Sequence, residues 1–495
     1  MGAPEALSFL DSKRWQGRVY GPTWAAAQGG VVDVVEPATG ETLSQVGLAN
    51  ATDINAACET AAAAQPAWAA MAPRDRAAIM RRAGELFTQH AEELALVVAR
   101  ETGGILPKAQ HELREAALLC HLAAGLVLQP QGLTLPTTPG RLNIARRMPH
   151  GVVGVISPFN FPLILSLRAV APALAAGNAV VLKPDPQTPV SGGFIIARVF
   201  QEAGMPASVL QVLPGAAEAG EALVTNAHVR MIQFTGSTAV GRRIGELCGK
   251  HLKKVSLELG GKSSLIVLDD VATEAELDRA ASNVAWGAWL HQGQICMASG
   301  RVLVHEKVAP ALIARLVAKA THMPVGNPTS GQVALGPMIN ARQVARAHAI
   351  VLDSVKAGAK LEAGGTHDGL FYKPTVLSGV RPGMRAFDEE VFGPVVNLTT
   401  FATDDEAVAL ANQTEYGLAA AVISPSIARA MAIGDRLKTG MLHINDQTVN
   451  DECTNPFGGM GCSGNGGRVG GPADLDEYTQ WQWLTVKGEA PQYPF

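Results

Sequence analysis

Apolar and polar residues follow different periods along this chain, and each change of period marks a new structural unit. From Ala51 to about Val127 the apolar positions have the spacing of amphipathic helices, with a stop signal at Gly103-Gly104. Between Gly132 and Met148 the pattern changes to proline, threonine and alternating apolar positions. The chain is therefore predicted to pass from a helical region into an extended segment.

Short apolar runs then alternate with helical patterns. Strands are predicted at 151–157, 178–184, 208–215 and 229–237, and helices at 163–176, 191–203 and 218–225. This order predicts a parallel sheet that is covered by helices on both faces. A second α/β pattern begins near Ser263 and continues to about residue 460. In 477–489 aromatic and polar residues alternate, as in an exposed strand whose edge pairs with another subunit.

Size and composition agree with this organisation. The 495 residues are too many for one simple domain, and 47% hydrophobic against 17% charged residues is typical of large buried cores. A net charge of −4 gives no basic surface for nucleic acid or an anionic membrane. Pro158, Arg168 and Pro172 interrupt the apolar stretch 151–182, so no membrane span is predicted there.

The six cysteines are scattered and form no CxxC pair, which argues against a disulfide framework or a zinc site. The amino-terminal segment MGAPEALSFLDSKRW has no apolar stretch of the kind that a secretory signal needs. We therefore expect a cytoplasmic protein without a bound metal.

Cys296 lies in the segment HQGQICMASGRV, after a turn rich in glycine and glutamine. Glycines on both sides favour a backbone bend that presents the thiol to a cleft, where a thiolate can attack a carbonyl carbon. The alternative is an inert core cysteine packed between Ile295 and Met297, which is the usual setting of a lone cysteine. Among the other cysteines, only Cys462 in GGMGCSG has a comparable setting.

Glu258 ends an apolar strand in VSLELGGKSS and precedes the pair Gly260-Gly261. Partial desolvation between two leucines would raise the pKa of this carboxyl into the range of a general base. Two alternatives remain open at this point. Glu258 either faces solvent from an edge strand, or it binds a ribose, since it follows Gly236 by the 22 residues typical of a Rossmann unit.

Asn160 lies in SPFNFP, a rigid turn directly after a predicted strand. A carboxamide held there can donate a hydrogen bond to an oxyanion that forms when Cys296 adds to a carbonyl. The alternative is an asparagine that only satisfies its own turn.

Three segments suggest a nucleotide site. Lys183 follows a strand in NAVVLKP, where α/β sheets bind ligands at their carboxyl ends. Gly236 and Ser237 lie between a strand and a helix in FTGSTAVG, a context that suits a pyrophosphate. EEVFGPV offers the acid Glu390 for ribose hydroxyls and the ring of Phe392. The literal GxGxxG match at 459–464 follows no strand and is not predicted to bind phosphate.

Seven motifs occur in order between about residues 155 and 464: SPFNFP, LKP, FTGST, LELGGK, GQIC, EEVFGP and PFGG. In this combination the chain resembles the aldehyde dehydrogenase superfamily over essentially its whole length. The resemblance implies an α/β fold with a Rossmann-like coenzyme domain at 1–128 and 150–261, and an α/β catalytic domain at 262–464. It also implies a small extended β arm for oligomerisation at 129–149 and 465–495, and hence a homodimer or homotetramer.

The resemblance assigns roles to individual residues. It implies Cys296 as nucleophile, Glu258 as the base that activates water, and Asn160 as oxyanion donor. Contacts to NAD, with NADP as the alternative coenzyme, are implied for Ser157, Phe159, Lys183, Gly215, Phe234, Gly236, Ser237, Gly241, Glu390 and Phe392. Because Glu258 is present, hydrolysis of the thioester is favoured over acyl transfer to coenzyme A.

Two positions depart from the pattern of many relatives. Pro186 stands where NAD-preferring members carry a glutamate three residues after the lysine, which leaves the choice between NAD and NADP open. Phe159 stands where many relatives have tryptophan, a change of little chemical consequence.

The stretch HINDQTVNDE and the ending QYPF resemble the benzaldehyde and vanillin dehydrogenase branch of the superfamily. The apolar pocket expected for a flat ring, and thus for oxidation of benzaldehyde to benzoate, consists of Phe161, Leu165, Ile295, Met297 and Phe457. Arg168 either reaches this pocket and binds a polar or anionic substituent, or forms a surface or interdomain salt bridge. An aliphatic aldehyde or semialdehyde substrate, and a cysteine-dependent thioester hydrolase, are the alternative functions.

Overall fold

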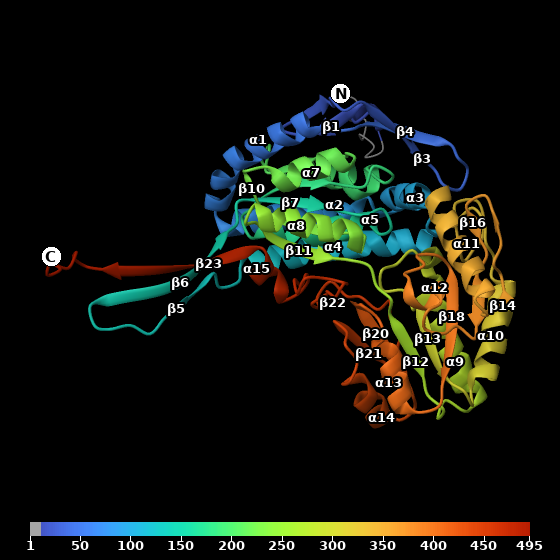
Figure 1. Ribbon diagram of the computed structural model, residues 1–495. Helices are drawn as coiled ribbons and strands as arrows, with labels where there is room; N and C mark the ends of the chain where they lie inside the picture. Colours follow the sequence, from blue (N-terminus) through green and yellow to red (C-terminus); the bar gives the residue numbers. More distant parts are fainter. Residues whose placement is uncertain (1–10) are drawn as a thin grey trace.

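The computed structural model describes residues 11–495. The predictions that concern residues 1–10, including the absence of a secretory signal, lie outside this range. Figure 1 shows two α/β bodies, with a narrow arm that extends from the first body and carries the carboxy terminus.

The first body is built on a seven-stranded sheet with strand order β11-β10-β7-β8-β9-β1-β2. Its strands are β1 (Arg18–Tyr20), β2 (Trp24–Ala26), β7 (Val152–Ile156), β8 (Ala179–Lys183), β9 (Leu210–Val212), β10 (Val229–Thr235) and β11 (Lys254–Glu258). The five strands from β11 to β9 are mutually parallel, and β1 and β2 add antiparallel strands at the far edge. The parallel sheet predicted from the alternating pattern is confirmed, whereas β1 and β2 were not predicted.

Helices cover both faces of this sheet because its strands are apolar on both sides. On β8, Val180 and Leu182 pack into one core and Ala179 and Val181 into the other. The helices of the first core are α2 (Pro73–Gln89), α3 (Ala91–Thr102), α4 (Leu106–Val127), α5 (Pro162–Ala175) and α6 (Ile195–Glu202). Those of the second are α1 (Ala51–Ala70), α7 (Ala217–Thr225) and α8 (Thr238–Lys250).

One predicted helix begins differently from its sequence pattern. The segment 191–203 starts as a single π-turn at Val190–Phe194 before α6. The buried carboxylate of Glu101 accepts hydrogen bonds from the backbone N–H groups of Val190 and Ser191, at 3.0 and 2.6 Å. A distant side chain therefore satisfies the amides at the start of this segment, which no local pattern reveals.

The second body has a sheet with strand order β14-β17-β18-β13-β12-β20-β21, in which only β14 runs antiparallel to its neighbour. Its strands are β12 (Ser264–Val267), β13 (Arg301–His305), β14 (Lys360–Ala363), β17 (Thr375–Ser378), β18 (Val395–Phe401), β20 (Ala419–Ile423) and β21 (Met441–Ile444). Its helices are α9 (Glu274–Trp289), α10 (Ala309–His322), α11 (Ala341–Lys356), α12 (Arg385–Asp388), α13 (Asp404–Asn412) and α14 (Ile427–Gly434). The second α/β region is therefore confirmed.

The arm is a three-stranded antiparallel sheet with order β23-β6-β5. Its strands are β5 (Gly132–Thr134), β6 (Arg141–Pro149) and β23 (Thr479–Lys487), and the short helix α15 (Ala473–Glu477) precedes β23. Trp481 and Trp483 on β23 are 50% and 69% exposed. Three two-stranded antiparallel pairs complete the fold: β3 (Val31–Val35) with β4 (Thr42–Gly47), β15 (His367–Asp368) with β16 (Phe371–Tyr372), and β19 (Tyr416–Gly417) with β22 (Met460–Gly461).

Candidate active site

A cleft of about 590 Å³, open to solvent, lies at the carboxyl ends of β7, β10 and β11. The first body and the second body both contribute to its wall. It is lined by Pro158, Phe159, Asn160, Leu165, Thr235, Gly236, Ser237, Leu259, Gly260, Cys296, Gln343, Arg346, Glu390 and Phe392. Parallel α/β sheets bind ligands at this edge, so the cleft is the candidate active site.

A strained loop presents Cys296 to this cleft. His291 and Gln292 adopt left-handed backbone conformations with φ of 48° and 56°, and Gly293 follows with φ of 66°. Such conformations are costly for residues other than glycine and are concentrated at functional sites. These φ values show the predicted bend before Cys296. Cys296 itself is only partly buried and lines the cleft.

The surroundings of Cys296 disfavour the thiolate form of its side chain. Burial raises its pKa above the usual range, and the nearby carboxyl groups of Glu390 and Glu258 raise it further. A base, or a cation brought into the cleft, is therefore needed before Cys296 can act as a nucleophile.

Asn160 follows β7 and lines the same cleft as Cys296. Its side-chain Nδ2 donates to the backbone carbonyl of Gln294 at 2.8 Å, which fixes the amide beside the nucleophile loop. An amide nitrogen carries two N–H groups, so the second one can donate to an oxygen in the cleft.

Glu258 is the last residue of β11, which is an edge strand, but its side chain is only 3% exposed. The alternative in which Glu258 faces solvent is therefore wrong. Neither carboxylate oxygen has a hydrogen-bond partner within residues 11–495. Burial raises the pKa of Glu258 well above its ordinary value, and Arg468 and Arg168 oppose this shift. A carboxyl group of raised pKa is suited to take a proton near neutral pH.

The side chain of Glu258 lines a smaller cavity of about 230 Å³ next to the cleft, and not the cleft itself. Leu165 and Thr235 line both spaces, so the two spaces adjoin. Gln233, Arg168 and Phe457 also line the smaller cavity.

Arg168 is buried and forms a bidentate ion pair with Asp451, with N–O distances of 2.7 and 2.8 Å. Its guanidinium lies 5.0 Å from the ring centroid of Phe457. Of the two alternatives for Arg168, the ion pair exists but is not at the surface, and the side chain also lines the cavity beside Glu258. Asp451 neutralises much of the positive charge of Arg168 that would otherwise attract an anionic group of a substrate.

Several predicted coenzyme contacts lie together on the cleft wall. Gly236 and Ser237 precede α8, and the Ser237 hydroxyl accepts from the Val240 N–H as its amino-terminal cap. Phe159 and Phe392 meet edge to face, with ring centroids 6.0 Å apart. Because the cleft combines a helix amino terminus, aromatic walls and a carboxylate at Glu390, its residues fit a dinucleotide.

Other predicted coenzyme residues lie behind the wall. Lys183 is buried at the end of β8, and its ammonium donates to the Gly215 carbonyl at 2.8 Å. Ser157 accepts a hydrogen bond from Ser166 at 2.7 Å. Phe234 and Gly241 pack beneath the turn: Phe234 lies in the buried core, and a Cβ at Gly241 would approach Leu259 to 2.3 Å.

The predicted substrate residues are less closely grouped. Leu165 lines the cleft and Phe457 lines the cavity of Glu258. Ile295 lines a separate cavity behind the loop of Cys296. Phe161 and Met297 line none of these spaces. The sequence analysis missed Gln343 and Arg346, which α11 brings to the cleft, and Asp451, the partner of Arg168.

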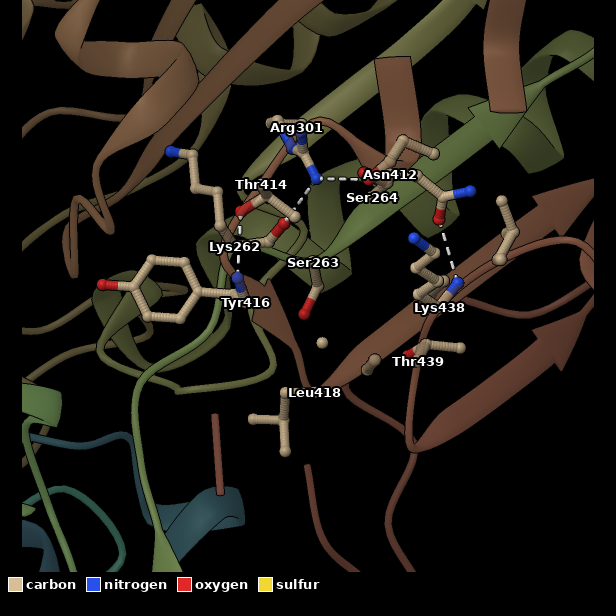
Figure 2. Close-up of a pocket in the computed structure, with 15 residues that line it drawn as sticks. Lys262, Ser263, Ser264, Arg301, Asn412, Thr414, Tyr416, Leu418, Lys438 and Thr439 are labelled. Carbon is tan, nitrogen blue, oxygen red and sulfur yellow. Dashed lines mark hydrogen bonds between the residues drawn. The ribbon is translucent and has the colours of Figure 1, made fainter. Parts of the chain in front are cut away.

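A further cavity beside β12 and β20 contains none of the predicted site residues (Figure 2). The Ser263 hydroxyl points into it, and Lys262 and Arg301 also line it. Within the described chain, no three His, Cys, Asp or Glu side chains are grouped to hold a metal. Over the same residues, every helix is too short or too polar to cross a membrane.

Residues 24–484 match the family model described as aldehyde dehydrogenase family. The chain therefore belongs to the aldehyde dehydrogenase family, which confirms the family and the α/β fold predicted from the motifs.

Individual relatives agree with this assignment. A vanillin dehydrogenase of an Amycolatopsis species is 54% identical over 99% of this chain and 100% of its own length. A benzaldehyde dehydrogenase [NAD(+)] of Pseudomonas putida is 51% identical over 97% of this chain and 98% of its own length. The crystal structure of an NAD-dependent aldehyde dehydrogenase from Sinorhizobium meliloti superposes with a TM-score of 0.93 at 35% identity. This match covers 100% of this chain and 99% of that one.

Proposed function

We propose that this aldehyde dehydrogenase oxidises an aromatic aldehyde of the benzaldehyde type to its carboxylic acid, with NAD as coenzyme. The observation that carries the proposal is that Cys296 and Asn160 line one cleft, with the Asn160 amide bonded to the loop of Cys296, next to the cavity of the buried Glu258. The similarity to benzaldehyde and vanillin dehydrogenases supports the substrate class.

In the first half of the reaction, the sulfur of Cys296 bonds to the aldehyde carbon after its proton has passed to a base. The electron pair of the C=O double bond moves to the oxygen, and this oxyanion accepts hydrogen bonds from the Asn160 amide and the Cys296 backbone N–H. NAD, when bound, supplies the acceptor for the hydride that leaves the carbon. Cys296 then carries the acyl group as a thioester.

In the second half, Glu258 takes a proton from a water molecule, and the resulting hydroxide attacks the thioester carbon. The C–S bond breaks, the acid leaves and Cys296 returns to its starting form. The raised pKa of Glu258 favours this step because a weakly basic carboxylate would accept the proton less readily.

The proposed preference for NAD is supported by Asp185, which the sequence analysis did not consider. Asp185 lies two residues after Lys183 and interacts with it electrostatically. Its carboxylate accepts from the Gln187 backbone and side chain. An acid at this position would repel a 2′-phosphate, although Pro186 replaces the glutamate of many NAD-preferring relatives.

The location and the assembly are also proposals. A reducing cytoplasmic location is supported by the six cysteines, all of which are free thiols in the structure. A homodimer or homotetramer is supported by the arm, whose edge strand β23 exposes Trp481 and Trp483. The domain limits at 128, 150, 261 and 464 remain proposals of the same kind.

The test is NADH formation by the purified protein with benzaldehyde, with an aliphatic aldehyde, and with NADP in place of NAD. A kcat/KM at least tenfold higher for benzaldehyde with NAD is expected. Higher turnover of the aliphatic aldehyde would contradict the aromatic substrate. Ester or thioester cleavage without NADH formation would favour the hydrolase alternative.

A further inference from the structure

Two buried charges on α4 contact the turn that carries Asn160. Lys108 and Glu112 lie one helical turn apart and pair with each other, and they are 5% and 0% exposed. Burying an ion pair costs desolvation free energy that mutual attraction does not always return. The contacts of this pair therefore indicate why the fold retains it.

The pair holds both sides of the turn between β7 and α5. The ammonium of Lys108 donates to the backbone carbonyl of Asn160 at 2.8 Å. The carboxylate of Glu112 accepts from the backbone N–H groups of Leu163 and Ile164, at 3.1 and 3.3 Å. These amides belong to the first turn of α5 and have no partner inside the helix.

Lys108 also contacts the loop that leads to Cys296. Its ammonium lies 4.4 Å from the ring centroid of Phe161, and that ring meets His291 edge to face at 5.3 Å. Burial, followed by the charge of Lys108, lowers the pKa of His291 well below its ordinary value, so the imidazole is neutral. The pair therefore touches the turn of Asn160 and, through one aromatic ring, the strained loop before Cys296.

We propose that Lys108 and Glu112 position the oxyanion-binding amide of Asn160 against Cys296, and so accelerate the chemical step without touching the substrate. This inference rests on the proposed role of Asn160. Lys108 fixes the backbone carbonyl of Asn160 by a hydrogen bond, and Glu112 fixes the start of the helix that follows. The Gln294 carbonyl accepts from the side-chain amide of Asn160 and so fixes its orientation. An oxyanion donor stabilises the transition state only while its N–H points at the developing charge.

The test compares four enzymes: the wild type, K108M/E112Q, N160A and the triple variant that combines them. The glutamine keeps an acceptor for the α5 amides, and the methionine removes the charge, so no uncompensated ion stays buried. With Asn160 present, K108M/E112Q is expected to lower kcat/KM for the aldehyde by about ten- to a hundredfold. In the N160A background the same two changes are expected to alter kcat/KM by less than about twofold.

An equal loss in both backgrounds would overturn the proposal, because it would show a general structural role. No loss with Asn160 present would also overturn it. If N160A alone retains wild-type kcat/KM, the oxyanion role of Asn160 fails, and the positioning role fails with it. A different result, in which N160A loses activity but K108M/E112Q does not, would leave the role of Asn160 intact and overturn only the positioning role of Lys108 and Glu112.

Two measurements separate positioning from loss of fold. The dissociation constant for NAD, followed by fluorescence, is expected to stay within about twofold of wild type in K108M/E112Q. R429M is the matched control: it breaks the ion pairs of Arg429 with Asp404 and Asp269 on the outer side of the second body. It is expected to lower the melting temperature without changing kcat/KM. If K108M/E112Q does not fold, K108M alone takes its place in the same comparison, because Glu112 then keeps its hydrogen bonds from the α5 amides.

Discussion

Replacing Glu258 by glutamine is expected to stabilise the protein while it abolishes most of the activity. The side chain is 3% exposed, and neither carboxylate oxygen has a hydrogen-bond partner in the described part of the chain. A buried polar group without a partner costs about 1–3 kcal/mol, and a charged one costs more. E258Q keeps the shape and leaves an uncharged amide, so it removes the cost of the charge. The free energy of unfolding at pH 7.5 should therefore rise by about 1.4 kcal/mol for each unit by which burial raises the pKa of Glu258, counted up to pH 7.5.

The gain in stability should depend on pH. Burial raises the pKa of Glu258 in the folded protein above its value in the unfolded chain, about 4.3. Between these two values the folded protein binds the extra proton, so the free energy of unfolding of the wild type falls as the pH rises through that range. E258Q does not titrate. Its advantage should therefore be absent below about pH 4 and grow as the pH rises towards the folded pKa.

The assay is thermal unfolding of both proteins from pH 4 to pH 8, together with steady-state kcat for benzaldehyde. Loss of a general base is expected to lower kcat by about 10²- to 10⁴-fold. Two results would refute the claim that an unpaired charge at Glu258 destabilises the folded protein. One is a variant that is less stable than wild type at pH 7.5, and the other is a difference in melting temperature that does not change with pH. An unchanged kcat would refute the role of the base.

Three further changes test other parts of the account. G236A should raise KM for NAD about tenfold, since a Cβ there would lie 2.5 Å from a phenylalanine ring. G249A, on the following helix α8 and in open space, should not. D451A should lower the free energy of unfolding by roughly 3–5 kcal/mol in urea titrations, because it leaves the buried Arg168 unpaired. A loss below about 1 kcal/mol would show that Arg168 finds another partner. D185N should raise kcat/KM with NADP relative to NAD by about tenfold, and an unchanged ratio would dismiss Asp185 as the discriminating charge.

Elements with a clear local period were predictable from the sequence. The helices between residues 51 and 127 and the strands β7, β8, β9 and β10 fall within or close to the predicted ranges, because each has one apolar period and a glycine or proline at its end. Strands β1 and β2 were not predicted, since three residues are too few to show a period.

Parts of the site depend on contacts between distant segments and could not be predicted. The burial of Glu258 on an edge strand requires residues near Gly464, which pairs with it some 200 residues along the chain. The ion pair of Arg168 with Asp451 joins the two bodies, and no local pattern selects its partner. Lys108 and Glu112 resemble any surface pair on a helix until α4 packs against the turn of Asn160. The motifs identified candidate residues, whereas tertiary packing determines their charge and orientation.

The central claim is that Cys296 carries the acyl group and that Glu258 is needed to release it. The most direct measurement is mass spectrometry of E258Q after incubation with benzaldehyde and NAD, followed by peptide mapping. We predict one benzoyl group on the peptide that contains Cys296, and none in E258Q/C296S or when NAD is omitted. A benzoyl group on another cysteine, such as Cys462, or no adduct while E258Q still forms NADH in a single turnover, would contradict the account.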